Sequence, residues 1–271
     1  TGLVPPADIR SRLKKTRGML GKQILAYIGD TVWEFLVLRH QYMQVVRSPF
    51  TESQAVRSLK QAKICANLYH GSVLNDEEKA VIKWAMGNTW RRAVKFNQSA
   101  VEQVGLEQYS AALGLRTLLG YLYIDEETDD SRLEAIVHEM GLTAPQGEED
   151  QLLSEVTGGV YDASLMPRPA TFFLALSPLG HTALRLYVCR YFCQRPLRAS
   201  EFIYRVKLAL RGEELDLASV GFMRDEATEE ELGLMKGARD QQDTYSFAFE
   251  CLLGHLALTK PYRLHQIVSD F

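Results

Sequence analysis

Residues 24–37 read Ile24-Leu-Ala-Tyr-Ile-Gly29-Asp30-Thr-Val-Trp-Glu34-Phe-Leu-Val37, and this stretch predicts one long, largely buried helix. Its apolar residues recur at helical spacing and form one face, which consists of Ile24, Leu25, Ile28, Val32, Phe35 and Leu36. Asp30 and Glu34 are one turn apart, so both carboxylates project from the same side of the helix. Gly29 costs about 1 kcal/mol relative to alanine inside a helix, which indicates close packing against another helix.

A second copy of this pattern lies at residues 174–188, which read Leu174-Ala-Leu-Ser-Pro-Leu-Gly180-His181-Thr-Ala-Leu-Arg185-Leu-Tyr-Val188. When the two glycines are superposed, a threonine two residues later and a valine eight residues later coincide as well. Acidic residues occur only in the first copy of the pattern. The register aligns three pairs, Gly29 with Gly180, Asp30 with His181, and Glu34 with Arg185.

Further landmarks repeat in the same order along the two halves of the chain. They are Pro49-Phe-x-x-Ser53 with Pro196-Leu-x-x-Ser200, Lys60 with Lys207, Asp76-Glu-Glu-Lys with Thr228-Glu-Glu-Glu, Leu115-Arg116-Thr-Leu-Leu-Gly120 with Phe249-Glu250-Cys-Leu-Leu-Gly254, and Arg132-Leu-x-x-Ile136-Val with Arg263-Leu-x-x-Ile267-Val. Repetition on this scale predicts a duplicated domain. The predicted organisation is a basic N-terminal arm at 1–17, a first domain at 18–140, an acidic linker containing Pro and Gly at 141–170, and a second domain at 171–271.

Periodicity and capping residues predict that the chain is all-α. Helices are expected at about 18–43, 52–71, 109–123 and 132–140, with one more that Asn75 caps ahead of an acidic first turn. Thr51 is the expected N-cap of the second of these helices. The basic segment at 90–95 is expected to be a loop.

The composition of the 271 residues is that of a folded protein. Hydrophobic residues make up 46% and aromatic residues 10%, which is enough for a buried core. No window approaches about 18 consecutive apolar residues, so no membrane-spanning segment and no membrane partner are expected. Four cysteines lack metal-ligand spacing and are expected to be buried, reduced thiols, namely Cys65, Cys189, Cys193 and Cys251.

The net charge of −3 conceals a gradient along the chain. Residues 1–63 hold eleven Lys or Arg against four Asp or Glu, whereas residues 141–170 hold five acids and one arginine. A basic arm of this kind contacts nucleic acid or an acidic partner, or it is an ordinary solvated run of charge. The chain begins at Thr1 rather than at Met, and removal of an organelle presequence is one expectation.

These landmarks resemble the ribonuclease III domain, and in particular its short Mini-ribonuclease III branch. The stretch Leu25-Ala-Tyr-Ile-Gly-Asp30-Thr-Val-Trp-Glu34 is similar to the first signature of that branch. Residues 118–123, Leu-Leu-Gly-Tyr-Leu-Tyr, are similar to the second signature, which Phe-Glu-Ala normally precedes. The resemblance covers residues 20–140 and 171–271. Because the family is a helical dimer, it implies an intramolecular pseudo-dimer that requires no homodimer.

The resemblance implies an enzyme that cuts double-stranded RNA with Mg²⁺, a hard cation that prefers oxygen ligands and activates water against a phosphodiester. In this branch the metal is held chiefly by the Asp of the first signature and the Glu of the second. Asp30 in the first half and Glu250 in the second half match these ligands. Their partners are replaced, since Arg116 stands for the Glu of the first half and His181 for the Asp of the second. The other acids of the larger ribonuclease III signature are also replaced, by Gln23, Ala26, Leu174 and Ser177.

We therefore expect two degenerate sites with no intact catalytic pair and no cofactor. Arg116 is expected to pair with Asp30, because a planar guanidinium can engage a carboxylate bidentately. His181 is expected to pair with Glu250. If the protein is active, the alternative is Mg²⁺ held by Asp30 and Glu34, although Arg116 would repel that ion.

The predicted function is that of a catalytically inactive, RNA-binding scaffold that recognises the shape and phosphates of structured or double-stranded RNA. The expected RNA contacts are Lys14, Lys15, Arg17, Arg57, Lys60, Lys63, Arg91, Arg92 and Lys207. Because degenerate ribonuclease III domains occur in organellar ribosomes, the resemblance implies by analogy a component or assembly factor of the large ribosomal subunit. Its partners would be rRNA and ribosomal or assembly proteins, in the mitochondrial matrix or alternatively in a plastid.

Two other functions remain open from the sequence. One is a Mg²⁺-dependent endoribonuclease that processes structured organellar RNA. The other is a scaffold that binds only proteins, which the negative net charge favours.

Overall fold

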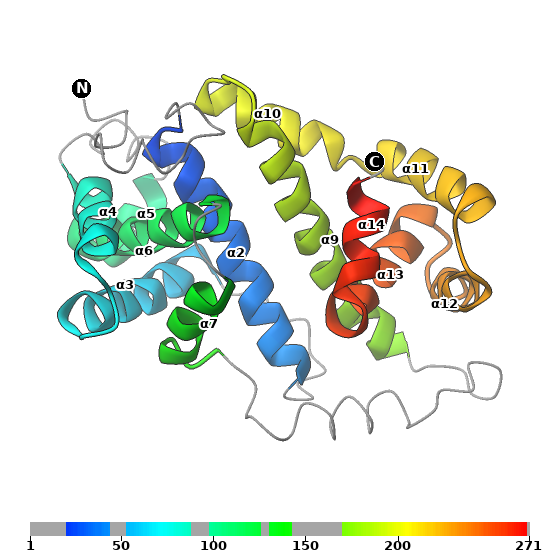
Figure 1. The fold of residues 1–271 in the computed structure, drawn as a ribbon, viewed down its shortest axis with the longest axis horizontal. Helices are drawn as coiled ribbons and strands as arrows, with labels where there is room; N and C mark the ends of the chain where they lie inside the picture. Colours follow the sequence, from blue (N-terminus) through cyan, green and yellow to red (C-terminus); the bar gives the residue numbers. More distant parts are fainter. Residues whose placement is uncertain (1–19, 44–52, 88–97, 126–129, 143–169, 270–271) are drawn as a thin grey trace. The chain divides into compact units, whose positions relative to one another are not determined.

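The computed structural model describes residues 20–43, 53–87, 98–125, 130–142 and 170–269. Within these ranges every regular element is an α-helix, which confirms the predicted all-α fold (Figure 1). The helices of the first half are α2 (Lys22–Met43), α3 (Gln54–His70), α4 (Asp76–Met86), α5 (Gln98–Val104), α6 (Leu106–Ile124) and α7 (Asp130–Glu139). Those of the second half are α9 (Ala170–Cys193), α10 (Ala199–Ala209), α11 (Gly212–Asp225), α12 (Glu229–Arg239), α13 (Tyr245–Thr259) and α14 (Pro261–Ser269).

The chain divides into two compact units, and each of them includes a segment from the other half of the sequence. Unit 1 consists of Thr1–Trp33, Phe50–Thr143 and Cys189–Tyr204, and unit 2 of Glu34–Pro49, Ala144–Val188 and Arg205–Phe271. Helices α2 and α9 are therefore both shared between the units. The sequence-based domains at 18–140 and 171–271 stay a prediction.

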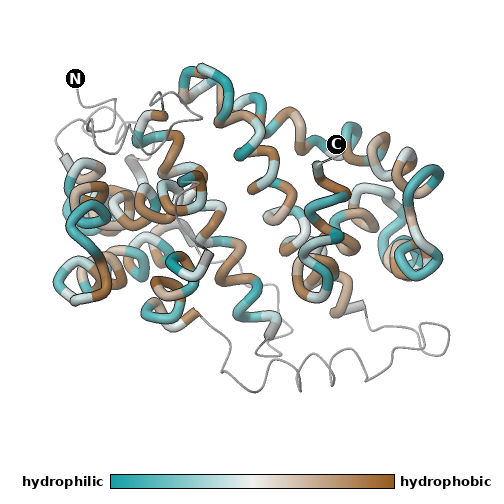
Figure 2. Tube along the Cα trace, in the orientation of Figure 1, coloured by the Kyte–Doolittle hydropathy of each residue, from teal (hydrophilic) through white to brown (hydrophobic). Residues whose placement is uncertain are grey.

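Helix α6 is the centre of unit 1. Thirteen of its nineteen residues are buried, and helices α3, α4, α5 and α7 all pack against it. A helix that is hydrophobic around its whole circumference needs neighbours on every side. Hydrophobic and hydrophilic residues are mixed along the outer helices (Figure 2), as expected of helices that pack one side against a neighbour and expose the other.

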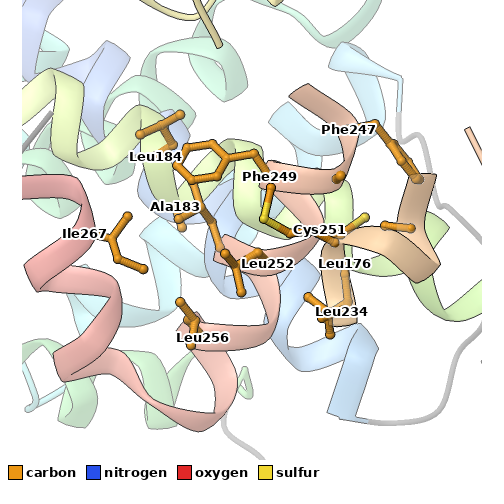
Figure 3. Packing of buried hydrophobic residues seen from close by; sticks show 14 of the residues in the cluster. Leu176, Ala183, Leu184, Leu234, Phe247, Phe249, Cys251, Leu252, Leu256 and Ile267 are labelled. Carbon is orange, nitrogen blue, oxygen red and sulfur yellow. The ribbon is translucent and has the colours of Figure 1, made fainter. Parts of the chain in front are cut away.

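Helix α13 has the same role in unit 2. It packs against α11, α12 and α14, and Phe249, Leu252 and Leu256 project from it into the core (Figure 3). Leu176 and Leu184 of α9 complete this core. Burial of these side chains is the main source of stability in unit 2.

Each unit contains one point where two helix backbones touch because both helices carry glycine there; we call this contact the glycine crossing. In unit 1, a Cβ atom on Gly29 of α2 would lie 1.6 Å from the carbonyl oxygen of Arg116, and one on Gly120 of α6 would lie 2.0 Å from that of Leu25. The close packing predicted from Gly29 is thus confirmed. No side chain other than hydrogen fits at either position.

The glycine crossing of unit 2 has the same construction. A Cβ atom on Gly180 of α9 would lie 1.8 Å from the carbonyl oxygen of Glu250, and one on Gly254 of α13 would lie 2.2 Å from that of Leu176. In both units the obstructing carbonyl belongs to the residue four positions before the second glycine. The residue after Gly29 or Gly180 is therefore brought next to residue 116 or 250.

A capping box is present in each unit, and an arginine from the last described helix of the same half binds it. In unit 1, Asn75 and Glu78 form the box, and the Nε of Arg132 donates to Glu78 at 2.7 Å. The second nitrogen of Arg132 donates to the carbonyl of Val73 at 2.7 Å. This network fixes the start of α4 and attaches α7 to it.

The corresponding network of unit 2 joins α12 to α14. Thr228 and Glu231 form the capping box, and the Nε of Arg263 donates to Glu231 at 2.9 Å. Arg263 also donates to the carbonyl of Glu226 at 3.0 Å. The two boxes align Thr228 with Asn75, which corrects the sequence-based alignment of Thr228 with Asp76 by one residue. The error arose because the acidic run was aligned by composition rather than by its cap.

Besides shifts of a few residues at the ends of α2 and α7, the structure differs from the sequence-based helices at three places. Ser53 caps α3, since its hydroxyl accepts from the backbone of Val56 at 3.3 Å, and the expected cap Thr51 lies outside the described residues. Helix α6 begins at Leu106 rather than at Tyr109, because its first three residues are exposed and carry no apolar pattern. Helix α5 was not predicted, and the basic segment at 90–95 lies outside the described residues.

Helix α9 is long and apolar enough over Phe172–Cys193 to cross a membrane, by length and composition. Half of that window is buried inside the structure. Phe173, Leu176 and Ala183 of this helix belong to the hydrophobic core of unit 2, so core packing accounts for its apolar character.

All four cysteines are buried and free, as expected. Burial raises the pKa of Cys65 to about 12 and also raises the pKa of Cys193 and of Cys251. These thiols therefore stay protonated at neutral pH and behave as small hydrophobic side chains.

The glycine crossings predict a large and specific sensitivity to alanine. Gly29→Ala and Gly180→Ala should each lower the free energy of unfolding by about 3 kcal/mol, since the new methyl group forces two helices apart. Gly233→Ala in α12 is the matched control, because nothing lies within 4 Å of the added Cβ, and it should stabilise by up to about 1 kcal/mol. Urea denaturation followed by circular dichroism measures all three. Equal changes in the free energy of unfolding at the three positions would contradict the close contact of helix backbones at the glycine crossings.

The Glu231–Arg263 pair predicts a defined acid sensitivity. Burial works against the charged form of Glu231, but hydrogen bonds from Arg263 and Thr228 outweigh it and hold the pKa below its ordinary value of 4.5. The pair thus stabilises the fold fully above that ordinary pKa, and the stabilisation is lost as the pH falls through the lowered folded-state value. Glu231→Gln should be less stable at pH 7 and should lose less stability than the parent between pH 5 and pH 3. Glu230→Gln changes an exposed neighbouring residue, and this control should lose as much stability between pH 5 and pH 3 as the parent does.

Candidate functional site

The first candidate site lies in unit 1, where the glycine crossing brings Asp30 of α2 next to Arg116 of α6. Arg116 Nε lies 3.3 Å from Asp30 Oδ1, so the expected ion pair is present, but the expected bidentate hydrogen bonding is not, because Arg116 donates to Gln61 and Ser58 instead. The Arg116 residue is only 4% exposed. A charge buried to this degree requires a counter-charge and hydrogen bonds.

Helix α3 supplies those hydrogen bonds. Arg116 donates from Nε to Gln61 Oε1 at 2.7 Å and from Nη2 to Ser58 Oγ at 3.1 Å. Because the Nε hydrogen points at Gln61, the contact with Asp30 is an ion pair without a hydrogen bond, and Asp30 Oδ1 is buried without a hydrogen-bond partner among the described residues. The guanidinium is thus held by Gln61 and Ser58 in front of the carboxylate.

A second arginine also faces Asp30. Arg57 Nη1 of α3 lies 3.7 Å from Asp30 Oδ2, so two guanidinium groups surround one carboxylate. This arrangement does not fit Mg²⁺, which needs oxygen ligands and an uncompensated negative charge. A divalent ion at Asp30 would have to displace a buried arginine that has hydrogen bonds to two other side chains.

The second candidate site lies in unit 2, where the second glycine crossing brings His181 of α9 next to Glu250 of α13. His181 Nδ1 lies 2.8 Å from Glu250 Oε1, which is the second pair expected from the sequence. Ser177 Oγ donates to the other carboxylate oxygen at 2.7 Å. Both oxygens of Glu250 therefore have protein partners.

An open pocket of about 390 Å³ adjoins this second site. Glu250 and Ser177 lie at its wall together with three further polar residues, Gln242, Thr244 and Ser246. The pocket contributes one carboxylate and neutral hydroxyl or amide groups, not the paired carboxylates that the resemblance implies for Mg²⁺. Among the described residues, no group of three or more His, Cys, Asp and Glu side chains gathers as a metal site would require.

Glu34, the alternative metal ligand, is turned toward a different partner from Asp30. Its carboxylate lies 3.3 Å from Arg185 Nη1, within unit 2. Asp30 and Glu34 project from the same helix, but Asp30 faces Arg57 and Arg116 whereas Glu34 faces Arg185. Positive charge therefore opposes a metal ion at either carboxylate.

The basic residues proposed from the sequence as RNA contacts are only partly within the described residues. Arg57, Lys60 and Lys63 all lie on α3 of unit 1, with both lysines exposed. Lys207 is exposed on α10, in the part of the chain that belongs to unit 2. Five of the proposed contacts lie outside the described residues, namely Lys14, Lys15, Arg17, Arg91 and Arg92.

Two residues of the first site were not predicted from the sequence. Ser58 and Gln61 are completely buried, three positions apart on α3, and both bind Arg116. Polar residues at buried helix positions are a signal for such a network. In the sequence these two polar residues are not distinguishable from the solvent-exposed ones, because the same helix also carries the basic residues Arg57, Lys60 and Lys63.

Comparison with known proteins identifies the family. The Ribonuclease III domain matches residues 23–127. Mini-ribonuclease 3 of Synechococcus sp. is 32% identical over 130 residues, which cover 46% of this chain and 83% of that protein. Mini-ribonuclease 3 of Clostridium tetani is 31% identical over 118 residues, which cover 42% of this chain and 72% of that protein. The chain belongs to the ribonuclease III family.

The matched ribonuclease III domain contains the whole first site. Residues 23–127 include Asp30 of α2, Arg57 of α3 and Arg116 of α6. Glu250 and His181 lie outside this match. No solved structure matches the chain at a significant level.

Arg116→Leu should lower the free energy of unfolding by about 3 kcal/mol, because the change leaves Asp30, Ser58 and Gln61 without their buried partner. Arg57→Leu is the control, since it removes a partly exposed guanidinium on the same carboxylate, and it should cost no more than about 1 kcal/mol. The double variant Asp30→Asn/Arg116→Leu should lose less than the sum of the two single variants. Chemical denaturation checks these values, and strict additivity would contradict the pairing.

Proposed function

We propose that this chain is a tandem ribonuclease III protein that has lost catalysis in both domains and binds structured or double-stranded RNA as a scaffold. One observation carries the proposal. A basic side chain, Arg116 in one unit and His181 in the other, lies against the carboxylate, Asp30 or Glu250, that the family would use for its metal.

The duplication is supported by contacts that recur in both units at matching positions. The glycine crossings place Gly29 and Gly180 against the carbonyl groups of residues 116 and 250. The two arginine-bound capping boxes follow in the same order, each with its carbonyl acceptor five residues before the glutamate. Equivalent networks in equivalent order are expected of two copies of one domain.

For the two domains we propose an intramolecular pseudo-dimer, because the ribonuclease III family that the sequence resembles is a helical dimer.

The proposed RNA contacts are Arg57, Lys60 and Lys63 of α3. The lysines are exposed one turn apart along the helix, and Arg57 lies at the edge of the first site. Phosphate contacts of this kind recognise the backbone of a duplex rather than its sequence. The similarity to the Mini-ribonuclease 3 proteins, whose name denotes an RNA-cleaving enzyme, supports RNA as the ligand.

For the cellular role we propose a component or assembly factor of the mitochondrial large ribosomal subunit, with rRNA and ribosomal or assembly proteins as partners. Only analogy with degenerate ribonuclease III domains in organellar ribosomes supports this setting. Pull-down of the endogenous protein followed by RNA sequencing tests it. Recovery of large-subunit rRNA is expected, and recovery of other RNA alone would contradict it.

A Mg²⁺-dependent endoribonuclease is the second candidate function. It is favoured by the extent of the match, which covers 83% of the Synechococcus Mini-ribonuclease 3, and by the retention of Asp30 and Glu250. It differs from the scaffold in one measurable property, which is cleavage of duplex RNA.

The full chain should bind a long RNA duplex and leave it uncut in Mg²⁺ and in Mn²⁺, beside the Synechococcus Mini-ribonuclease 3 as positive control. Lys60→Ala/Lys63→Ala should weaken binding and reduce the slope of log Kd against log salt concentration by about 2, roughly one for each lost phosphate contact. Lys236→Ala/Lys260→Ala removes equal charge from unit 2 and should bind like the parent. Cutting that Asp30→Asn abolishes would establish the endoribonuclease instead. Absence of binding would leave a protein-only scaffold.

A further inference from the structure

The turn between α9 and α10 carries basic and aromatic side chains to which the proposed function gives no role (Figure 1). All of them are exposed, and all belong to the segment Cys189–Tyr204 of unit 1. Glu201 is the only acidic residue in that segment, so positive charge is in excess there. We call these residues the arginine–tyrosine cluster, which consists of Arg190, Tyr191, Arg195 and Arg198.

The backbone beneath this cluster is packed into the fold. Cys189 and Cys193 of α9 are buried, and Phe202 of α10 is completely buried. The ring of Phe202 lies edge-on to that of Tyr27 on α2, with the two centroids 6.1 Å apart, and both residues belong to unit 1. Pro196 restricts the turn further, because its ring fixes φ. The cluster therefore stands on a backbone with little freedom to move.

Within the cluster, the guanidinium of Arg195 lies over the ring of Tyr191. The Cζ atom of Arg195 is 4.7 Å from the centroid of that ring, and its Nη2 donates to the Tyr191 hydroxyl. The same Cζ atom is 5.9 Å from the centroid of the Phe192 ring. Attraction between a cation and an aromatic face holds the guanidinium in this position. The pair thus presents a flat, positively charged surface to solvent before any ligand binds, which lowers the entropic cost of binding.

The other two arginines of the cluster have no acidic partner. Arg190 and Arg198 form no ion pair with any residue that the structure describes, and both are exposed. Their charges are therefore available to an anionic ligand. An exposed tyrosine alone would need no explanation, but here it coincides with three neighbouring arginines.

Single-stranded RNA fits this combination of side chains. Its phosphates supply negative charge at every nucleotide, and its unpaired bases stack on aromatic rings or on guanidinium planes. A duplex keeps its bases stacked inside, so an exposed ring offers it little. A protein partner would have to bring several carboxylates to the arginines, whereas RNA carries the required charge along its whole backbone.

We infer that the arginine–tyrosine cluster binds unpaired nucleotides of an RNA ligand, with a base stacked on Tyr191 or Arg195 and phosphates at Arg190 and Arg198. The inference rests on RNA binding in the proposed function and goes beyond it, because α3 was assigned to the backbone of a duplex. The preferred ligand is accordingly RNA that contains unpaired nucleotides, such as a loop or an overhang.

Fluorescence anisotropy of the full chain with a labelled single-stranded oligouridine of about 12 nucleotides tests the inference. Tyr191→Ala should weaken binding about tenfold, because it removes one base–aromatic stack. Tyr191→Phe keeps the ring and should bind like the parent. Tyr262→Ala in α14 is the matched control, since Tyr262 is 75% exposed against 55% for Tyr191 and has no ring contact with the described residues. This control should also bind like the parent.

Variants of the arginines separate the effect of charge from that of stacking. Arg190→Ala/Arg198→Ala should reduce the slope of log Kd against log salt concentration by about 1.4, since each phosphate contact with a single strand contributes about 0.7. Arg195→Lys keeps the charge but loses the planar group. It should therefore weaken binding severalfold and leave the salt dependence unchanged.

A blunt RNA duplex is measured beside the single strand with every variant, and the cluster variants should bind the duplex like the parent. Equal affinities of Tyr191→Ala and Tyr262→Ala for the single strand, or equal weakening of single strand and duplex by Tyr191→Ala, would overturn the inference. A parent that binds the duplex but not the single strand would overturn the inference alone. A parent that binds neither RNA would overturn the proposed function as well and would indicate a protein partner for the cluster.

Discussion

The contact of two helix backbones at paired glycines is the constraint on which the rest of the structure depends. Gly29 and Gly120 in unit 1 allow α2 to lie directly on α6, and Gly180 and Gly254 allow the same between α9 and α13. Such close approach leaves no freedom in the register of the helices. The residue after the first glycine is consequently held against a fixed position of the central helix, and the chemistry of the site is decided by the two side chains there.

Those side chains are a carboxylate and a basic group in both units. In unit 1 the guanidinium of Arg116 is buried and held by Gln61 and Ser58, whereas in unit 2 the imidazole of His181 lies beside Glu250 near an open pocket. The packing of a ribonuclease III domain can thus be kept while a basic side chain lies beside the carboxylate. This separation of fold from chemistry is general, because scaffold contacts and site residues are largely different residues.

Short-range patterns allowed much of the fold to be predicted from the sequence. The long helix α2, the Asn75 cap and the pairing of Asp30 with Arg116 all follow from spacing and resemblance. The partners of Arg116 on α3 could not be foreseen, because the burial of Ser58 and Gln61 is a tertiary property. Likewise, the contact of Glu34 with Arg185 joins positions 151 residues apart, and periodicity gives no information on it. The start of α6 was predicted three residues too late, because its first turn is exposed and carries no apolar pattern.

Binding of Mn²⁺ to the full chain, followed by the EPR signal of the free ion, tests the central claim most directly. We have proposed that neither Asp30 nor Glu250 holds a metal, because Arg116 or His181 occupies the position beside the carboxylate. The account predicts that the free-ion signal with protein equals the signal in buffer, and that Asp30→Asn and Glu250→Gln change nothing. One tightly bound Mn²⁺ per chain that either substitution abolishes would contradict it, because a carboxylate paired with a basic group would then still be a metal ligand.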